Sequence, residues 1–233
     1  MVDATTAGEM GSPRQSSSDR IVRDIKQGMY EGRFVAGQRL AEPDLMRLYE
    51  VGRSTVREAL QRLAAEGVVT VTAHRGAQVR HLSRAEARDL LQLLEVTIGL
   101  AARLAALRIR EPGMREQFIK AYEGLAAFAG REDSYDLVRA RNRFYHAMNR
   151  VGGNGLLGTL IDGFNVHLIR TYLRRPSQER FADYRAMADA ILAGDGGRAE
   201  IVARRHLRNV MTALDEAPDS IFAPGAPTQP QTT

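Results

Sequence analysis

The chain has 233 residues, a formal net charge of +5 and a hydrophobic fraction of 44%, which suffices for a packed core and excludes wholesale disorder. It contains no cysteine, which excludes a disulfide framework and a thiolate metal site. Since it also shows no evident apolar run of about 18 residues and no secretory signal, we expect a cytoplasmic protein that does not span a membrane.

The first part of the chain alternates short helical segments with turns. Residues 1–18 are rich in Ser, Thr, Gly and Ala without periodicity, and they are expected to be a disordered tail. From Asp19, which is expected to cap the first helix, apolar residues recur at helical spacing. A second helix is expected to begin near Pro43, and a third is expected over residues 54–66.

Residues 68–82 show a different pattern. The stretches VVTVTA and AQVRHL alternate and are rich in β-branched residues, and the turn HRG separates them. This pattern predicts a two-stranded hairpin. Three short helices followed by such a hairpin predict a winged helix-turn-helix domain over residues 19–83.

Residues 84–216 are expected to be helical almost throughout. The turn sequences EPG, GRED, GGNG, RRPS and GDGG divide this stretch. The expected helices are 84–110, 112–129, 134–151, 156–173, 178–193 and 197–216. Together they predict an all-α bundle of about six helices, so the fold class is mostly α. The Pro-rich residues 217–233 are expected to be a second disordered tail.

Charge is distributed unevenly along the chain. Residues 20–84 carry 12 arginines and lysines against 7 acidic residues, whereas residues 85–233 carry 20 against 18. The first of these segments therefore holds a surplus as large as that of the whole protein. A basic segment beside a nearly neutral one indicates two domains, of which the first has an anionic partner.

The third expected helix separates its residues into two faces on a helical wheel. Apolar residues share one side, which should face the core: Val56, Ala59, Leu60 and Leu63. Hydrogen-bond donors share the other side and the N-terminal end: Arg53, Ser54, Arg57 and Gln61. Thr55 points less clearly outward, so it could be either a contact residue or a helix cap.

Donors at this end of the second helix of a helix-turn-helix suit the major groove of DNA. Arginine can pair bidentately with guanine O6 and N7, and Ser and Thr can bond phosphates or bases. The expected wing tip, His74, Arg75 and Gly76, adds a cation for the backbone or the minor groove. The alternative for Arg57 is an ordinary surface arginine that pairs with Glu58 or Glu50.

The stretch from IKQGMYEGRF to RGAQV resembles the GntR family of bacterial transcription regulators. It contains the family pattern as GRFVAGQRL, then EPDL, then VGRSTVREALQRLAAEG and RGAQV. The resemblance implies that Arg53, Ser54, Thr55 and Arg57 contact the major groove and phosphates, and that the wing glycine region reaches the minor groove. Relatives often carry an arginine where this sequence has Pro43, which implies that one DNA contact is missing or moved.

Residues 84–212 resemble the FCD effector-binding domain of the FadR-type branch of this family. The resemblance rests on ARDLLQLLEVTIGLAARLAA, on NRFYHAM followed by GGN, and on DYRAMADAILAGD followed by RRHL. Many such domains hold a divalent metal with an Asp, a His four residues later and two further His. The corresponding positions here are Asn142, His146, Tyr184 and His206.

This set predicts weak or no metal binding, because Asn is a neutral ligand and Tyr stays protonated near neutral pH. A residual site of Asn142, His146 and His206 with a bound carboxylate is an alternative. Relatives often carry Arg and Glu where our alignment places Leu94 and Ile98. The pocket should therefore be more apolar than usual, which suits a larger or less charged ligand. The expected effector is an organic acid or a larger apolar acyl-type ligand.

The sequence therefore predicts a ligand-responsive transcriptional repressor that binds an inverted-repeat operator as a homodimer. His167 and Arg170 could also line its pocket, or be surface or core residues. One alternative is a constitutive DNA-binding protein with a degenerate pocket. Another is a hydrolase that uses His146 and His206, although the sequence has no nucleophile elbow, phosphate loop or carboxylate-rich metal set. We expect no enzyme and no certain cofactor.

Overall fold

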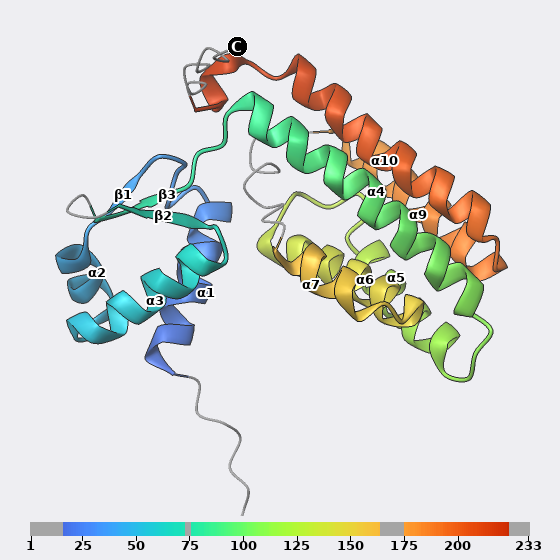
Figure 1. Ribbon diagram of the computed structural model, residues 1–233, viewed down its shortest axis with the longest axis horizontal. Coiled ribbons are helices and arrows are strands. Elements are labelled where there is room, and N and C mark those ends of the chain that lie inside the picture. Colours follow the sequence, from blue (N-terminus) through green and yellow to red (C-terminus); the bar gives the residue numbers. More distant parts are fainter. Residues whose placement is uncertain (1–15, 73–75, 164–174, 224–233) are drawn as a thin grey trace, which may run out of the picture.

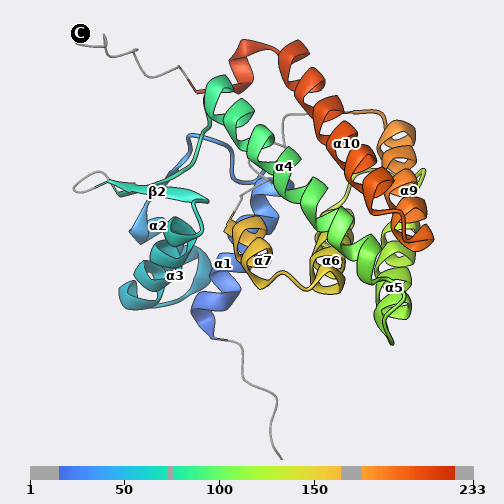
Figure 2. The same cartoon turned by 45° about the vertical axis from the view of Figure 1, so that its right-hand side comes forward.

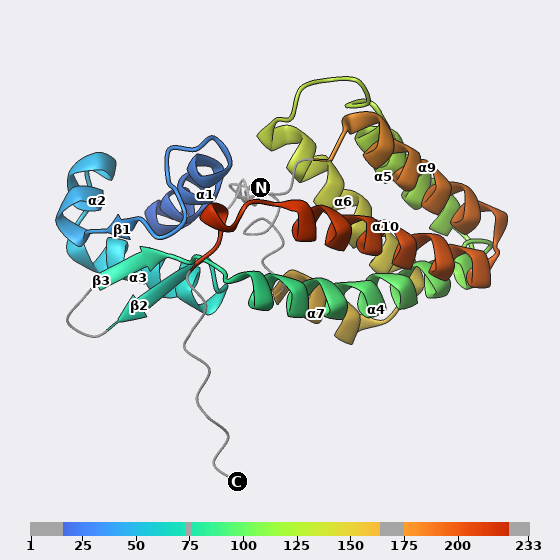
Figure 3. The same cartoon turned by 90° about the horizontal axis from the view of Figure 1, so that it is seen from above.

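The protein is described by a computed structural model that covers residues 16–72, 76–163 and 175–223. Three short helices and a small sheet form one domain, and long helices form the other (Figure 1). The two domains lie side by side and are joined by a short linker that leads into helix α4 (Figure 3). This arrangement confirms the expected fold class, a winged helix-turn-helix followed by a helical bundle.

Helix α1 (Ser17–Tyr30) begins earlier than the sequence suggested. Ser16 is its N-cap: the Ser16 hydroxyl accepts from the backbone N–H of Asp19, and the Asp19 carboxylate accepts from the backbone N–H of Ser16. The expectation that Asp19 caps the helix after a tail of residues 1–18 was therefore wrong. The sequence Ser-x-x-Asp forms a capping box, in which the acidic residue lies inside the first turn.

The wing contains one more strand than expected. Strands β2 (Val69–Thr72) and β3 (Gly76–Val79) form the predicted hairpin, and β1 (Arg39–Leu40) pairs antiparallel with β3 to give the order β1-β3-β2. A two-residue strand is too short to show alternation, so sequence periodicity could not reveal it. Helices α2 (Glu42–Tyr49) and α3 (Arg53–Ala65) complete the domain.

The helical domain consists of long helices around α4. Its described members are α4 (Arg84–Arg108), α5 (Met114–Ala126), α6 (Tyr135–Gly152), α7 (Gly155–Gly163), α9 (Ser177–Ala193) and α10 (Gly196–Glu216). The expected helices are present with boundaries shifted by a few residues. The expected helix 156–173 is described only as α7, because residues 164–174 lie outside the described residues.

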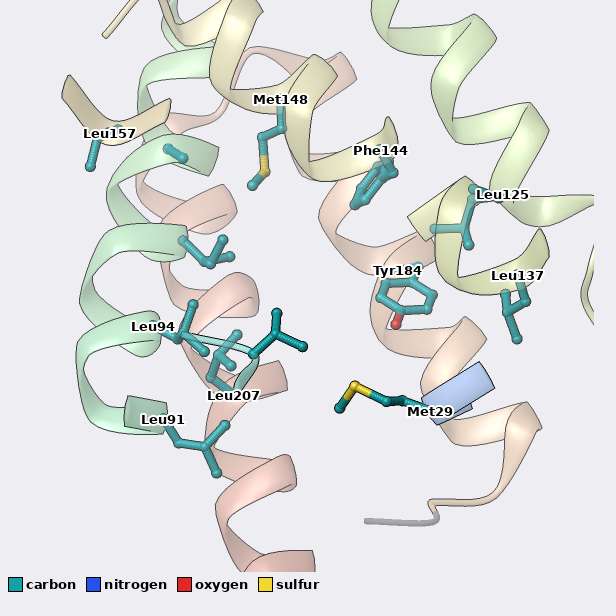
Figure 4. Packing of buried hydrophobic residues seen from close by; sticks show 14 of the residues in the cluster. Met29, Leu91, Leu94, Leu125, Leu137, Phe144, Met148, Leu157, Tyr184 and Leu207 are labelled. Atoms are coloured by element: carbon teal, nitrogen blue, oxygen red, sulfur yellow. The ribbon is translucent and has the colours of Figure 1, made fainter. Parts of the chain in front are cut away.

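Helix α4 packs along the length of α10 and also contacts α6 and α9 (Figure 2). Four small residues of α4 are buried and allow the neighbouring helices to approach it closely: Ala101, Ala102, Ala105 and Ala106. At Gly99, a Cβ atom would lie 2.8 Å from the Arg204 side chain of α10. Figure 4 shows Leu94 of α4 and Leu207 of α10 directed into the shared core, with Phe144 of α6 next to Tyr184 of α9.

Helix α4 is long and apolar enough to cross a membrane by length and composition, and it is the one described helix with this property. The expectation of no apolar run of about 18 residues was therefore wrong for this helix. Within its most apolar window, 44% of the residues are buried inside the structure. Core helices of globular domains pass the same test, and the packing of α4 against α10 and α6 accounts for its apolar character.

Residues 217–223 are ordered, which corrects the expectation that the chain is disordered from residue 217. A 3-10 turn, Asp219–Ile221, follows α10. The guanidinium of Arg84, at the start of α4, donates to the Ala217 carbonyl at 2.5 Å and to the Asp219 carboxylate at 2.8 Å. It also lies 4.4 Å from the ring centre of Phe222.

The same segment bonds the interdomain linker. The backbone N–H of Ala223 donates to the Leu82 carbonyl at 2.9 Å, and His81 Nε2 lies 3.1 Å from the Ile221 carbonyl oxygen. We call residues 217–223 with Arg84 the C-terminal clasp. A Pro-rich composition indicates disorder, but here the clasp ties the end of α10 to the start of α4 and to the linker.

The clasp predicts a stability effect at Arg84. The substitution Arg84→Ala should lower the free energy of unfolding by about 1–2 kcal/mol, because it removes the donor for the last carbonyls of α10 and the ring contact. Arg88→Ala, which removes an exposed ion pair with Asp215, is the matched control and should cost about 0.5 kcal/mol or less. Chemical denaturation measures both values. Equal losses for the two variants would contradict the clasp.

Candidate functional site

The beginning of α3 carries the candidate DNA-reading side chains on its exposed face. Arg53, Ser54 and Arg57 are exposed, and the side chains of the two arginines keep 63% and 60% of their accessible surface. The four apolar residues of the opposite face are buried, as the wheel predicted: Val56, Ala59, Leu60 and Leu63. The helix is therefore anchored on one side and leaves its donors outward on the other.

Thr55 is half-buried, and the N-cap position of α3 belongs to Gly52. The alternative that Thr55 caps the helix is therefore wrong. Because glycine supplies no capping side chain, no side-chain cap is seen for α3 among the described residues. Such a helix start carries partial positive charge and favours an anion.

Arg57 forms an ion pair, but with neither of the expected partners. Its Nε donates to Glu42 Oε1 at 2.8 Å, and the Nε of Arg53 lies 3.6 Å from Glu42 Oε2. Glu58 instead accepts a 2.6 Å hydrogen bond from Ser18. The sequence analysis missed Glu42, because contact between the start of α2 and the start of α3 depends on the turn that joins them.

The wing tip is only partly described. His74 and Arg75 lie outside the described residues, and Gly76 is the exposed first residue of β3. Its φ of +82° lies in the left-handed region that favours glycine, so this residue is required for the turn. An ideal Cβ on Gly76 would lie 3.9 Å from Nε of Arg39, which places a further exposed arginine beside the wing.

A polar network inside the helical domain joins α6, α9 and α10. The Tyr145 hydroxyl lies 3.2 Å from His206 Nε2, and His206 Nδ1 lies 2.9 Å from Asp183 Oδ2. Arg175 Nη1 donates to the same Asp183 oxygen at 2.8 Å. His206 is buried, as expected of a pocket residue.

Tyr145, which enters this network, is the neighbour of the expected pocket residue His146 on α6. His146 is exposed, whereas Arg141 is buried and Tyr145 is half-buried. Tyr145, the residue before His146 on α6, contacts His206. The site formed by Asn142, His146 and His206 stays a prediction.

The other expected pocket residues are buried. Tyr184 is 2% exposed, and its ring centre lies 5.2 Å from that of His206 and 6.1 Å from that of Phe144. Leu94 and Ile98 of α4 are buried in the core. The suggested lining residues His167 and Arg170 lie outside the described residues.

The charge states of this network follow from its contacts. Burial raises the pKa of Asp183, but hydrogen bonds from His206 and Arg175 outweigh it and hold that pKa well below the usual range. Burial, and then the neighbouring Tyr184 and Asp183, raise the pKa of Tyr145 well above its usual value. Asp183 is therefore ionised and Tyr145 protonated at neutral pH.

Metal binding finds little support in the part of the chain that the structure describes. Within it, no group of three or more His, Cys, Asp or Glu side chains could hold a metal ion. A protonated Tyr145 is a poor ligand, and Asp183 is already paired with Arg175 and His206. The residues present therefore do not fit a resident divalent cation.

Arg141 is a buried cation that the sequence analysis missed. Its side chain is 2% exposed, and Nη2 and Nε donate to Asn142 Oδ1 at 3.0 and 3.3 Å. Nη1 is buried without a hydrogen-bond partner, and no described carboxylate forms an ion pair with this residue. Arg141 lies one helical turn before Tyr145 on the same face of α6. A buried charge with only neutral partners is energetically costly.

A cleft of about 550 Å³ lies between α9, α10 and the chain that enters α9. Its polar lining includes Arg175, Glu179, Asp183, Asn209 and Glu216. Asp183 belongs both to this cleft and to the His206 network, so the buried polar groups connect to the surface there.

Comparison with known proteins identifies both domains. Residues 17–79 match the family described as "Bacterial regulatory proteins, gntR family", and residues 86–209 match the FCD domain. The chain is 26% identical over 203 residues to the uncharacterized HTH-type transcriptional regulator BphR of Paraburkholderia xenovorans (strain LB400), which covers 82% of each chain. It is 25% identical over 213 residues to the HTH-type transcriptional repressor GlaR of Escherichia coli (strain K12), covering 84% of this chain and 94% of GlaR.

A solved structure agrees at the level of the fold. E. coli McbR/YncC superposes with a TM-score of 0.71 at 17% identity, covering 86% of this chain and 98% of that chain. The two matched domains together span most of the described residues. The chain therefore belongs to the GntR family, in the FadR-like branch with a C-terminal FCD domain, and is a DNA-binding transcriptional regulator rather than an enzyme.

Proposed function

We propose that this protein is a ligand-responsive repressor, which acts in the cytoplasm and binds an inverted-repeat operator as a homodimer. The observation that carries the proposal is the exposed start of α3, where Arg53, Ser54 and Arg57 stand beside a helix N-terminus without a capping side chain. The similarity to GlaR, a repressor by name, supports the direction of regulation.

We call the start of α3 and the wing tip together the reading head. In the proposed complex, each part of it has its own role. Arg53 and Arg57 contact base edges, and Ser54 and Thr55 contact bases or phosphates at the start of the helix. His74, Arg75 and Gly76 bring the wing to the backbone or the minor groove. Pro43 contributes no charge at the place where relatives often carry an arginine.

Support for the homodimer comes from the outer face of α4. Large apolar side chains are exposed there at the spacing of a helix–helix seam: Leu93, Val96, Leu100 and Leu107. They are separated by three, four and seven residues along the chain, so they lie on one face of the helix. A second copy of the chain would cover this row and hold two reading heads at a fixed separation, as two half-sites require.

The effector is proposed to be an anion with an apolar body, an organic acid or a larger acyl-type ligand. Arg141 carries this part of the proposal, because a buried guanidinium with an open Nη1 gains most from a carboxylate. The aromatic rings of Phe144 and Tyr184 beside the polar network suit the apolar body. An effector that binds one head arrangement better than the other would release or reposition the heads.

DNA-binding measurements test the proposed sequence-specific recognition of an operator. Fluorescence anisotropy at physiological salt should show tighter binding to DNA from beside the protein's own gene than to random DNA. Arg57→Ala should lower the specific affinity by about 10- to 100-fold, because a bidentate guanine contact is worth about 1–3 kcal/mol, and should lower the nonspecific affinity much less. Equal affinity of the wild type for both DNAs would contradict the proposal. A uniform loss in Arg57→Ala would make Arg57 a phosphate contact only.

Thermal unfolding tests the proposed binding of an effector in the helical domain. Straight-chain carboxylates from butyrate to dodecanoate should include at least one that raises the Tm, while its matching amide does not, because only the acid neutralises Arg141. Arg141→Met should abolish this gain without lowering the Tm of the protein alone, since it removes a buried charge. The exposed neighbour Arg143→Met is the control and should keep the gain. No gain with any acid would favour a constitutive regulator with a degenerate pocket.

A further inference from the structure

One carboxylate contacts both candidate reading arginines. Glu42 is the first residue of α2, whereas Arg53 and Arg57 lie one turn apart at the start of α3. Glu42 Oε1 accepts from Arg57 Nε at 2.8 Å, and Glu42 Oε2 lies 3.6 Å from Arg53 Nε. Each carboxylate oxygen therefore faces one arginine, and both approach the same atom of the guanidinium, Nε.

Contact at Nε leaves the other donors of each guanidinium available. Among the described residues, the terminal Nη1 and Nη2 atoms of Arg53 and Arg57 have no recorded hydrogen-bond partner. A guanidinium fork that pairs with guanine O6 and N7 uses two parallel N–H groups. An arginine held at Nε is therefore turned so that its Nη edge is free for a base.

A contribution to folding stability does not explain why the Glu42 carboxylate contacts both arginines. The side chains of Arg53 and Arg57 keep 63% and 60% of their accessible surface, and that of Glu42 keeps 28%. Ion pairs this exposed contribute about 0–1 kcal/mol. Asp44 already supplies a second negative charge to the first turn of α2. A carboxylate on a surface that meets phosphates also lowers the affinity for DNA in general.

We propose that Glu42 is a positioning residue that orients Arg53 and Arg57 toward bases. It thereby raises sequence discrimination, at the cost of affinity for DNA of any sequence. The inference rests on the proposed role of the two arginines as base contacts. It predicts that removal of the Glu42 charge changes specific and nonspecific binding in opposite directions.

The experiment compares Glu42→Gln with Asp44→Asn. Both remove one carboxylate from the first turn of α2, but Asp44 pairs with Arg47 rather than with a reading arginine. Affinities for operator DNA and for random DNA are measured by anisotropy at several salt concentrations. Glu42→Gln should bind random DNA a few-fold tighter and operator DNA about 10-fold weaker. Asp44→Asn should bind both DNAs slightly tighter, with an unchanged ratio.

Two further variants distinguish an effect on the orientation of the arginines from an effect on protein stability. Glu42→Asp keeps the charge but withdraws it by one methylene, so its discrimination should fall between the wild type and Glu42→Gln. In an Arg57→Ala background, Glu42→Gln should change discrimination less, because one of its two targets is gone. The Tm should stay within about 2 °C of the wild type for Glu42→Gln, since the pair is exposed.

The outcomes distinguish this inference from the proposed function. If Glu42→Gln tightens binding to both DNAs equally, as Asp44→Asn does, then Glu42 only repels phosphates and the inference is wrong. The inference is also wrong if the wild type binds operator DNA more tightly than random DNA and Glu42→Gln keeps the same ratio of affinities. A wild type that does not discriminate between operator and random DNA overturns the proposed function and this inference together.

Discussion

The packing of α4 against α10 is the contact on which the rest of the structure depends. Gly99 lets the two helices approach closely, because a Cβ atom there would lie 2.8 Å from the Arg204 side chain. Ion pairs from Arg103 to Glu200 and from Arg208 to Glu95 flank this contact. Because α4 follows the wing after a short linker, the helix that forms the centre of the bundle also carries the DNA-reading domain.

This arrangement connects the helical bundle to the DNA-binding domain through α10, the clasp and the linker. The His206 network belongs to α10 and joins it to α6 and α9. At the C-terminal end of α10, about ten residues beyond His206, the clasp bonds Arg84 and the linker residue Leu82. A shift of α10 relative to α4 would therefore strain the clasp and reach the linker. Coupling requires that a ligand prefer one of the two arrangements, and neutralisation of Arg141 supplies such a preference in the proposed mechanism.

The sequence predicted some parts of the molecule well because simple periodicity controls them. In α3, apolar and polar residues separate cleanly, so the wheel located both Leu63 in the core and Arg57 on the surface. Helix α6 buries Arg141 and exposes Arg143, two residues of identical chemistry. Which arginine faces the interior depends on the rotation of the helix within the bundle, so residue type alone could not identify the buried one.

Other features depend on contacts between distant segments. Strand β1 is defined by its partner β3, and residues 217–223 are held by Arg84 and the linker, more than a hundred residues before them. The contact of Glu42 with Arg53 and Arg57 likewise crosses the turn between α2 and α3. Composition and local spacing carry no signal for such contacts, so the refinements of both candidate sites came from the structure.

The central claim is that the exposed start of α3 lies against DNA bases. Because the chain has no cysteine, a single Gln61→Cys substitution on the exposed face of α3 can carry an iron chelate that cleaves nearby DNA. The account predicts cleavage of operator DNA at two symmetric positions, and none from the same chelate at Glu116→Cys on α5. Cleavage scattered along the DNA, or equal cleavage from both sites, would contradict it.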